Sequence, residues 1–387
     1  MAIPLKYSYG NLVSRRVSTT ITVFGIGVVI AVMISMLALY NGVKTAIVSS
    51  GSAENLIVLR EGALTESTSW VTRDAYKIIR SLPGIGRDSH GEPLVSPELV
   101  MLFKLPKRDD PSGSNVNVRG VTPAAFEIRP YLRIVDGRIF QPGTNEMIVS
   151  RRVQRRFSNL EIGDSFSFGP RTWKVVGAFD GKGTSFDSEI WADAGYLGLS
   201  QKRDAYSSVL IRPADSGTAA SIIATIKGDN RLKLQVKTEL KYYQEQTSGL
   251  VGIIILVAFV TVFMVIGATL GTMNTMFAAV ASRKRELATL RALGFRRSAI
   301  LVTIVIESAV LSLLGGGLGL LLALPVNGIS TGTTNFQTFS EVAFNFRISP
   351  AVAVFALALA LVAGILGGLL PALGAARLPI TTALREV

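Results

Sequence analysis

The sequence of 387 residues contains no cysteine and a single histidine, His90. Without cysteine there is no disulfide, thiolate zinc site, iron–sulfur cluster or cysteine nucleophile. One histidine does not build a typical zinc site, and His90 lies in a loop rich in glycine and proline, where we expect an exposed side chain. We therefore predict no catalytic residue, no metal site and no cofactor on this chain, and we do not expect it to be an enzyme by itself.

Long stretches of the sequence lack charge. No Lys, Arg, Asp or Glu occurs between Arg16 and Lys44 or between Glu245 and Arg283. About 20 apolar residues in a helix cross a bilayer core. The run that starts at Val17 is longer than the roughly 7–15 residues of a signal-peptide core, so we predict an uncleaved anchor. Four stretches predict membrane-spanning helices: 17–40, 247–281, 299–324 and 351–373.

The net charge of +13 follows these apolar stretches. Residues 44–246 are nearly balanced, and no basic stripe with interleaved aromatic residues suggests a nucleic-acid groove. Lys and Arg in short loops mark the cytoplasmic side of a membrane protein. Such cations occur at Lys6, Arg15, Arg16, six positions within 283–297, Arg377 and Arg385, whereas the loop 325–347 has only Arg347. Both termini and the loop near 290 are therefore predicted to be cytoplasmic, and residues 44–246 extracytoplasmic.

The predicted fold class is a membrane protein with four transmembrane α-helices and a large mixed α/β domain inserted between the first and second helices. The predicted segments are 1–43 (tail and first helix), 44–246 (inserted domain), 247–281 (second helix), 282–298 (cytoplasmic helix), 299–324 (third helix), 325–349 (outer loop), 350–373 (fourth helix) and 374–387 (cytoplasmic tail). Short alternating strands dominate residues 95–200, which we interpret as an insert in an α/β frame.

The inserted domain offers weak motifs only. GKGTS (181–185) resembles a phosphate-binding loop but lacks the required glycine spacing. Asp180, Asp187, Glu189 and Asp193 do not have calcium-loop spacing, and we expect a solvated loop there. RRVQRR (151–156) places arginines four residues apart on one helical face. This face is either solvated or docks a partner or an anionic head group.

Three spans carry small-residue pairs at four-residue spacing, which lets helices approach closely in lipid. The pairs are Gly267 and Gly271, Gly315 and Gly319, and Gly364 and Gly368. Glu307 is the one ionisable residue within a predicted span. It is either a structural hydrogen-bonding group or a functional one, and we favour a structural role.

The segment SRKRELATLRALGFRRSAI (282–300) is a basic amphipathic helix between two spans. Its leucines can enter an apolar groove and its cations can pair with acids around that groove. A basic helix on anionic lipid is the alternative. Glu286 lies in the first turn and Gly294 suits the C-terminal end of the helix. The residues of this predicted docking surface are Arg283, Lys284, Arg285, Glu286, Leu287, Leu290, Arg291, Leu293 and Gly294.

Three segments, in order, resemble one family. They are GRIFQPGTNEMIVSRRVQRRFSNLEIGDSFSFGPRTWKVVGAF (137–179), RKRELATLRALGFRRSAILVTIVIESAVLSLLGGGLG (283–319) and PALGAARLPITTALR (371–385). Together with the four-span layout they resemble the MacB/FtsX-type, or type VII, ABC transporter permeases over nearly the whole chain.

The resemblance implies a permease of the bacterial inner membrane. A separate ABC-type ATPase that binds ATP and magnesium would dock on the coupling helix near residues 283–294. The permease would form a dimer with a second copy or a paralogue, and would convert ATP hydrolysis into movement of its outer domain. It would thereby export or extract a substrate. The alternative is an FtsX-like transmitter that regulates a cell-wall hydrolase without transport. The substrate, a periplasmic adaptor and an outer-membrane channel stay open.

Overall fold

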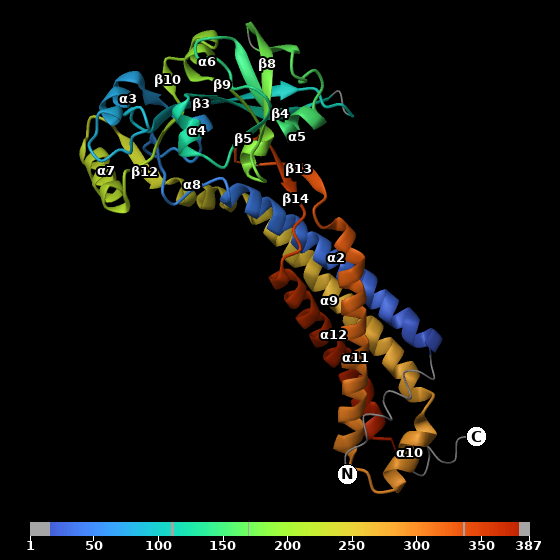
Figure 1. The fold of residues 1–387 in the computed structure, drawn as a ribbon. Helices are drawn as coiled ribbons and strands as arrows, with labels where there is room; N and C mark the ends of the chain where they lie inside the picture. Colours follow the sequence, from blue (N-terminus) through green and yellow to red (C-terminus); the bar gives the residue numbers. More distant parts are fainter. Residues whose placement is uncertain (1–15, 110–111, 169, 336, 379–387) are drawn as a thin grey trace. The chain divides into compact units, whose positions relative to one another are not determined.

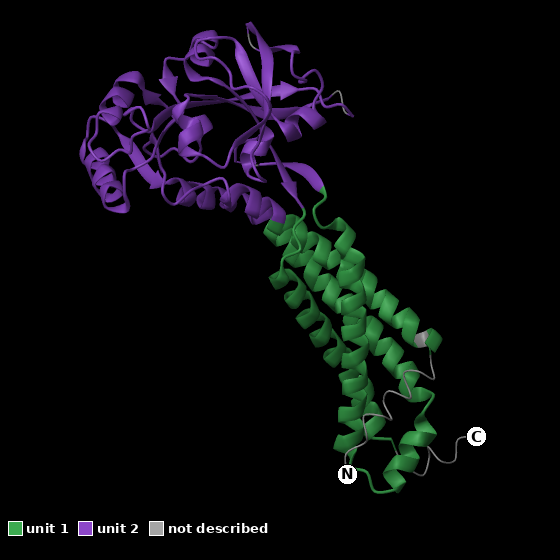
Figure 2. Ribbon diagram, viewed as in Figure 1, with its two compact units in different colours: residues 1–41, 253–329, 346–387 green, residues 42–252, 330–345 purple. Residues whose placement is uncertain are grey.

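The computed structural model describes residues 16–109, 112–168, 170–335 and 337–378. The chain divides into two compact units (Figure 2). The first, here called the bundle, comprises residues 1–41, 253–329 and 346–387. The second, here called the inserted domain, comprises residues 42–252 and 330–345. The predicted locations of the two termini fall on residues 1–15 and 379–387, which lie outside the described residues.

The bundle is α-helical (Figure 1). Its helices are α2 (Arg16–Val48), α9 (Val251–Ala281), α10 (Lys284–Ala292), α11 (Arg297–Ala323) and α12 (Pro350–Ala376), and the short turn η4 (Leu324–Val326) follows α11. Among the described residues, four helical stretches are long and apolar enough to cross a membrane: Thr19–Val48, Glu239–Ala281, Arg297–Val326 and Pro350–Ala376. The four-helix fold class is therefore confirmed.

The helix ends follow local rules. Pro350 occupies the first turn of α12, where its missing N–H is not needed, and the Ser349 hydroxyl accepts the Val352 N–H at 3.3 Å. In the inserted domain, Thr72 caps the N-terminus of α3 by accepting the Ala75 N–H at 3.2 Å.

The inserted domain has a mixed α/β fold. Its strands are β1 (Leu56–Arg60), β2 (Val71–Thr72), β3 (Val95–Leu105), β4 (Ser114–Val121), β5 (Arg133–Gly137), β6 (Glu146–Ser150), β7 (Ser165–Phe168), β8 (Arg171–Asp180), β9 (Glu189–Asp193), β10 (Ala205–Tyr206), β11 (Ser208–Ile211), β12 (Leu234–Thr238), β13 (Ser330–Thr334) and β14 (Glu341–Asn345). Its helices and turns are η1 (Glu66–Thr68), α3 (Arg73–Arg80), α4 (Ala124–Ile128), α5 (Arg151–Arg156), η2 (Ser185–Ser188), α6 (Ala194–Ser200), α7 (Ser216–Gly228), α8 (Glu239–Gln246) and η3 (Thr247–Leu250).

One mixed sheet runs through this domain in the order β12-β1-β11-β3-β4-β9-β6-β8-β5, with β7 paired to β8. One hydrophobic core includes Leu56, Ile79 and Ile222, and a second includes Val118 and Trp173. The first core belongs to the expected frame, and the second to the expected insert at residues 95–200. However, β3 pairs with both β11 and β4, so a continuous sheet joins them.

Two details differ from the sequence-based expectations. The sequence SGTAASIIATIKG suggests a helix with Ser216 as a possible cap, but the cap of α7 is Asp215, because its carboxylate accepts the Thr218 N–H at 2.8 Å and the two residues form a capping box. The expected outer loop 325–349 contains the hairpin β13–β14, and residues 330–345 belong to the inserted domain.

Candidate functional site

The buried pair Arg283–Glu307 lies at the N-terminal end of α10. Arg283 precedes α10 and is 7% exposed, and Glu307 in α11 is 5% exposed. The Arg283 Nη2 atom is 3.0 Å from Oε1 and 2.9 Å from Oε2 of Glu307. The structure thus joins two residues to which the sequence suggested separate roles. Glu307 accepts two hydrogen bonds from Arg283, so Arg283 is not available to pair with an acidic residue of a partner.

Leu287 also faces the bundle. It is 5% exposed and packs in a cluster with Met276 and Val280 of α9 and Ile300 and Ile304 of α11. A leucine that is already buried within its own chain cannot enter the groove of another protein. The docking surface that we propose below therefore leaves out Leu287 as well as Arg283.

Apart from Ala288, which is also buried, the remaining residues at α10 are more accessible. Arg285 and Glu286 are exposed, Lys284 and Leu290 are half-buried, and Leu293 is 70% exposed. The predicted leucine face is thus split, because 3.6 residues per turn rotate successive leucines away from the bundle.

The C-terminal end of α10 is fixed by two backbone hydrogen bonds and one side-chain hydrogen bond. Gly294 has φ of +92°, a left-handed conformation that glycine adopts without strain. The Gly294 N–H donates to the Arg291 carbonyl at 3.1 Å and the Phe295 N–H to the Leu290 carbonyl at 3.2 Å, which is the Schellman pattern. The Arg291 Nη1 donates to the Leu378 carbonyl at 2.8 Å. These bonds fix where α10 ends, and Arg291 links it to the residues after α12.

Two of the three predicted glycine pairs lie at close helix contacts. A Cβ on Gly319 would lie 2.7 Å from the Gly27 carbonyl oxygen of α2. A Cβ on Gly364 would lie 2.5 Å from the Ser312 side chain of α11. The other glycine of each pair also lies at a close contact. A Cβ on Gly315 would meet Ile26, and one on Gly368 would meet Ser308.

The third pair differs. A Cβ on Gly267 or Gly271 would have no described atom within 4 Å, so these glycines do not pack against another of the described helices. The close contact of α9 instead involves Gly367 of α12, where a Cβ would lie 2.7 Å from the Thr269 carbonyl oxygen. The spacing of small residues therefore did not identify which face of α9 is buried.

A buried charge network, which the sequence analysis missed, lies in the inserted domain. The Arg119 guanidinium contacts Glu66 at 2.8 Å, Glu98 at 2.7 Å and Glu189 at 2.7 Å. Arg129 joins Glu98 at 2.5 Å to Glu239 at 3.0 Å. All six side chains are at most 6% exposed. The available signal was a charged residue at inward positions of apolar strands, as in PELVMLF and NVNVRGV.

Burial and pairing act in opposite directions on these groups. Burial favours neutral forms, but Glu189, Glu66 and Glu98 raise the pKa of Arg119 well above its ordinary value. Burial alone would also raise the pKa of Glu66, yet the charge and hydrogen bonds of Arg119 leave it lowered. Arg119 and Glu66 are therefore both charged at neutral pH, and each depends on the other.

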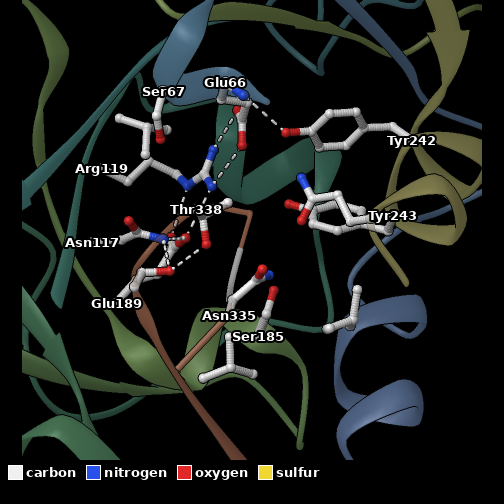
Figure 3. A pocket seen from close by; sticks show the side chains of 15 residues that line it. Glu66, Ser67, Asn117, Arg119, Ser185, Glu189, Tyr242, Tyr243, Asn335 and Thr338 are labelled. Carbon is white, nitrogen blue, oxygen red and sulfur yellow. Dashed lines mark hydrogen bonds and ion pairs between the residues drawn. The ribbon is translucent and has the colours of Figure 1, made fainter. Parts of the chain in front are cut away.

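A polar cavity of about 30 Å³ lies beside this network (Figure 3). Its volume is enough for about one or two water molecules. It is lined by parts of the domain that lie far apart in the sequence: Ile47 at the end of α2, Glu66 and Arg119 of the network, Tyr242 and Tyr243 of α8, and Asn335 and Thr338 of the hairpin segment. The cavity thus marks a junction within the inserted domain, where three of its segments meet that continue along the chain into the bundle.

The hairpin segment is held at this junction by buried polar contacts. Glu341 is 5% exposed and pairs with Lys107 at 2.8 Å and with Arg156 of α5. The Ala343 N–H donates to the Ser188 hydroxyl at 2.5 Å. Arg152, four residues before Arg156, pairs with Asp187 at 3.3 Å. One arginine face of α5 therefore pairs with carboxylates of the same domain while it stays half-buried.

The loop GKGTS does not present its amides to a ligand. The Gly181 and Gly183 N–H groups donate to the Asp187 carboxylate at 2.6 and 2.8 Å. Burial raises the pKa of Asp187, although Arg152 and these N–H donors oppose the shift. The chain's own carboxylate thus occupies the place that a phosphate would need. Among the described residues, no group of three or more His, Cys, Asp and Glu side chains could hold a metal ion.

Two family models match this chain. The MacB-like periplasmic core domain matches residues 19–228, and the FtsX-like permease C-terminal domain matches residues 250–380. Together with four apolar helices and an α/β domain between the first two, these matches define a multi-pass membrane permease. The chain belongs to the MacB-like, FtsX-like family of ABC permeases.

Similar proteins include the macrolide export ATP-binding/permease protein MacB of Hahella chejuensis, which is 26% identical over 98% of this chain and 60% of the relative. The pyoverdine export ATP-binding/permease protein PvdT of Pseudomonas putida is 27% identical over 96% of this chain and 57% of the relative. The chain therefore spans about three fifths of the length of the curated relatives it matches.

Two solved structures are also similar. The extracellular domain of the noncanonic ABC-type transporter YknZ from Gram-positive bacteria has a TM-score of 0.37 and 17% identity, and covers 47% of this chain and 99% of its own. The periplasmic region of MacB from Actinobacillus actinomycetemcomitans has a TM-score of 0.39 and 11% identity, and covers 51% of this chain and 94% of its own. Both TM-scores are low, so the family assignment depends on the sequence matches.

Proposed function

We propose that residues 1–387 form the permease part of an ABC transporter that exports or extracts a substrate. Relatives of this chain are named export ATP-binding/permease proteins, and the aligned part is about three fifths of their length. The ATP and magnesium would bind to a partner ATPase, and this chain would convert ATP hydrolysis into movement. The predicted location is the bacterial inner membrane, with α10 in the cytoplasm and residues 44–246 outside.

The observation that carries the proposal is the way α10 is attached. Arg283 and Leu287 fix the helix to α9 and α11, whereas Leu293, Arg285 and Glu286 remain on its accessible side. A partner ATPase that pushed on the accessible side would displace α11 through the bidentate Arg283–Glu307 pair. A loosely attached helix would yield instead, and the force would not reach the bundle.

In the proposed mechanism, movement of the helices reaches the inserted domain through the chain segments that connect them. α2 runs directly into the inserted domain, α8 leads through η3 into α9, and the hairpin β13–β14 connects α11 to α12. Residues of all three connections line the polar cavity beside Arg119. In the proposed mechanism, relative displacement of these connections reshapes the inserted domain, and no substrate passes between the helices. Two copies, or one copy and a paralogue, would act with two ATPase subunits.

The experiment is an affinity purification of the full chain from membranes in mild detergent, comparing Leu293→Asp with the wild type. The matched control is Leu199→Asp, because Leu199 of α6 is 72% exposed in the inserted domain. Losing the burial of one leucine at an interface should reduce recovery of the ATPase about tenfold or more. The control should retain it. An ATPase is identified by mass spectrometry of the recovered proteins.

Equal recovery with Leu293→Asp would contradict this docking surface, and absence of any ABC-type ATPase with the wild type would contradict the permease function. The transmitter alternative is separated by a second readout. A cell-wall hydrolase that depends on the inserted domain for activity, without any change in substrate export on deletion, would favour the FtsX-like transmitter.

A further inference from the structure

The segment 181–188, which comprises the loop GKGTS and the turn η2, has no role in the proposed docking of an ATPase. Its glycine amides bind the Asp187 carboxylate, so they do not bind a phosphate either. The segment instead contacts three parts of the inserted domain that continue along the chain into the bundle. These parts are the end of α2, the helix α8 and the hairpin β13–β14.

The end of α2 is bound at Ser185. The Ser185 hydroxyl lies 2.7 Å from the hydroxyl of Ser50, which follows α2, and the Ser185 N–H donates to the same Ser50 oxygen at 2.8 Å. The Ser50 hydroxyl in turn donates to the Ala46 carbonyl of α2 at 2.9 Å, and Ser50 is fully buried. These bonds fix the first residue of η2 to the last turn of α2.

The hairpin and α8 are bound by other residues of η2. The Ser188 hydroxyl accepts the Ala343 N–H of β14 at 2.5 Å. The buried Phe186 ring meets the Tyr243 ring of α8 edge to face, with 6.0 Å between the ring centroids. The short turn η2 therefore contacts all three parts that lead into the bundle.

The segment is closed by hydrogen bonds within itself. The Asp187 carboxylate accepts the Gly181 and Gly183 N–H groups at 2.6 and 2.8 Å. The Thr184 hydroxyl donates to the Gly181 carbonyl at 2.8 Å, and the Asp187 N–H donates to the Thr184 carbonyl at 3.1 Å. Asp187 is 2% exposed, so water does not compete for its oxygens. A displacement at one end of the segment therefore reaches the other end and is not absorbed by a loose loop.

Strand β9 continues directly from η2. It lies in the sheet between β4 and β6, and its first residue, Glu189, contacts Arg119 of the buried network at 2.7 Å. The Phe186 ring also meets Trp191 of β9 edge to face, with 5.6 Å between the ring centroids. A hydrogen bond is lost when its two heavy atoms separate by about 1 Å more than their usual distance. Movement of α2 or the hairpin by more than this must either break the bonds to η2 or carry η2 and the start of β9 with it.

We propose that the segment 181–188 passes displacement of α2 and of the hairpin to β9, and that Asp187 is the positioning residue that keeps the segment stiff. The proposal rests on the proposed function, because the ATPase would supply the displacement. The loop GKGTS then has a mechanical role, since its glycine N–H groups build a compact support instead of binding a ligand.

A variant that tests the segment must leave the contacts of α2 and the hairpin in place, because these two also meet directly: a Cβ on Gly42 would clash with the Asn345 carbonyl oxygen. Asp187→Ala meets this condition, since other residues of η2 bind α2 and the hairpin. The matched control is Asp193→Ala at the other end of β9. The Asp193 carboxylate is also buried and accepts the Tyr196 N–H at 2.7 Å, at the start of α6.

The first measurement is hydrogen exchange of the full chain in detergent without an ATPase. We expect Asp187→Ala to raise exchange about tenfold both in 42–51 and in 330–345, since two buried hydrogen bonds that close the segment are lost. Asp193→Ala should raise exchange in α6 and leave both of these stretches unchanged. Arg152→Ala, which removes only the ion pair of Asp187, should also leave 42–51 unchanged.

Equal exchange in 42–51 with Asp187→Ala and Asp193→Ala would overturn the proposal, as would a rise with Asp187→Ala that is confined to 181–188. An effect of Arg152→Ala as large as that of Asp187→Ala would overturn it too, because α5 would then make the link. If Asp187→Ala does not fold, Asp187→Asn keeps the size of the side chain and one acceptor oxygen. It should give a smaller rise in the same two stretches, and no rise there would count against the proposal.

The second measurement adds ATP to the complex purified with its ATPase. ATP should change exchange in 181–192 in the wild type and in Asp193→Ala, and this change should be lost in Asp187→Ala. An ATP-dependent change in 42–51 and 330–345 that leaves 181–192 unaffected in the wild type would overturn the proposal while the permease function stands. Failure to recover any ABC-type ATPase would contradict the permease function, and the exchange measured without ATPase would still decide whether the segment links α2 to the hairpin.

Discussion

Removing one partner of the Arg283–Glu307 pair should destabilise the bundle far more than removing both. The pair is bidentate and both side chains are less than a tenth exposed. Glu307→Leu leaves the Arg283 charge buried without its counter-charge, and Arg283→Met leaves Glu307 in the same situation. Removing one partner of a buried pair typically costs about 3–5 kcal/mol. Replacing both with apolar side chains of similar volume is often neutral.

The assay is a double-mutant cycle with Arg283→Met, Glu307→Leu and the double variant, measured by thermal unfolding of the full chain in detergent. A cost of about 3–5 kcal/mol corresponds to roughly 6–20 °C in Tm for a unit of this size. We expect the double variant to recover most of the loss, which corresponds to a coupling energy of about 5 kcal/mol or more. If the single losses simply add in the double variant, the two charges are not coupled and our account of how α10 is held to α11 is wrong.

Three further predictions follow from the described contacts. Glu66→Gln should cost about 1–3 kcal/mol at pH 7 by unfolding measurements, because a charged hydrogen bond to buried Arg119 is lost. Because the pKa of Glu66 is lowered in the folded state, its contribution to the free energy of unfolding is complete above the unfolded pKa of about 4.3 and is lost as pH falls through the folded value. The cost of Glu66→Gln should therefore shrink in acid, and a constant cost from pH 7 to pH 3 would contradict this. Gly319→Val should lower Tm because its Cβ would lie 2.7 Å from the Gly27 carbonyl oxygen, whereas Gly271→Val, with nothing within 4 Å, should not; equal shifts would mean that the α2–α11 contact is wrong. Glu341→Ala should increase hydrogen exchange in residues 330–345, since Lys107 and Arg156 lose their shared carboxylate, while Asp74→Ala in an exposed pair is the matched control and should leave exchange in that segment unchanged.

Some of the candidate site was readable from local sequence. Gly294 suited a helix C-terminus because a left-handed residue is needed there and glycine adopts it without strain. Leu293 and Arg285 are accessible, as a docking helix requires. The same reading assigned Arg283 and Leu287 to a partner, because amphipathic spacing shows that two faces differ but does not show which face meets the rest of the chain. Glycine spacing had the same limit at Gly267 and Gly271.

The sequence by itself determined the number of apolar spans, the place of the large insertion and the basic helix between the second and third spans. These features depend on runs of neighbouring residues. An uncharged stretch of about 20 apolar residues forms a stable helix in lipid whatever fold the rest of the chain adopts. Only the tertiary structure decided the Arg283–Glu307 pair, the Arg119 network and the hairpin at the polar junction. Each joins residues far apart in the chain, and a buried charge keeps its ionised form only when folding places its counter-charge within hydrogen-bonding distance.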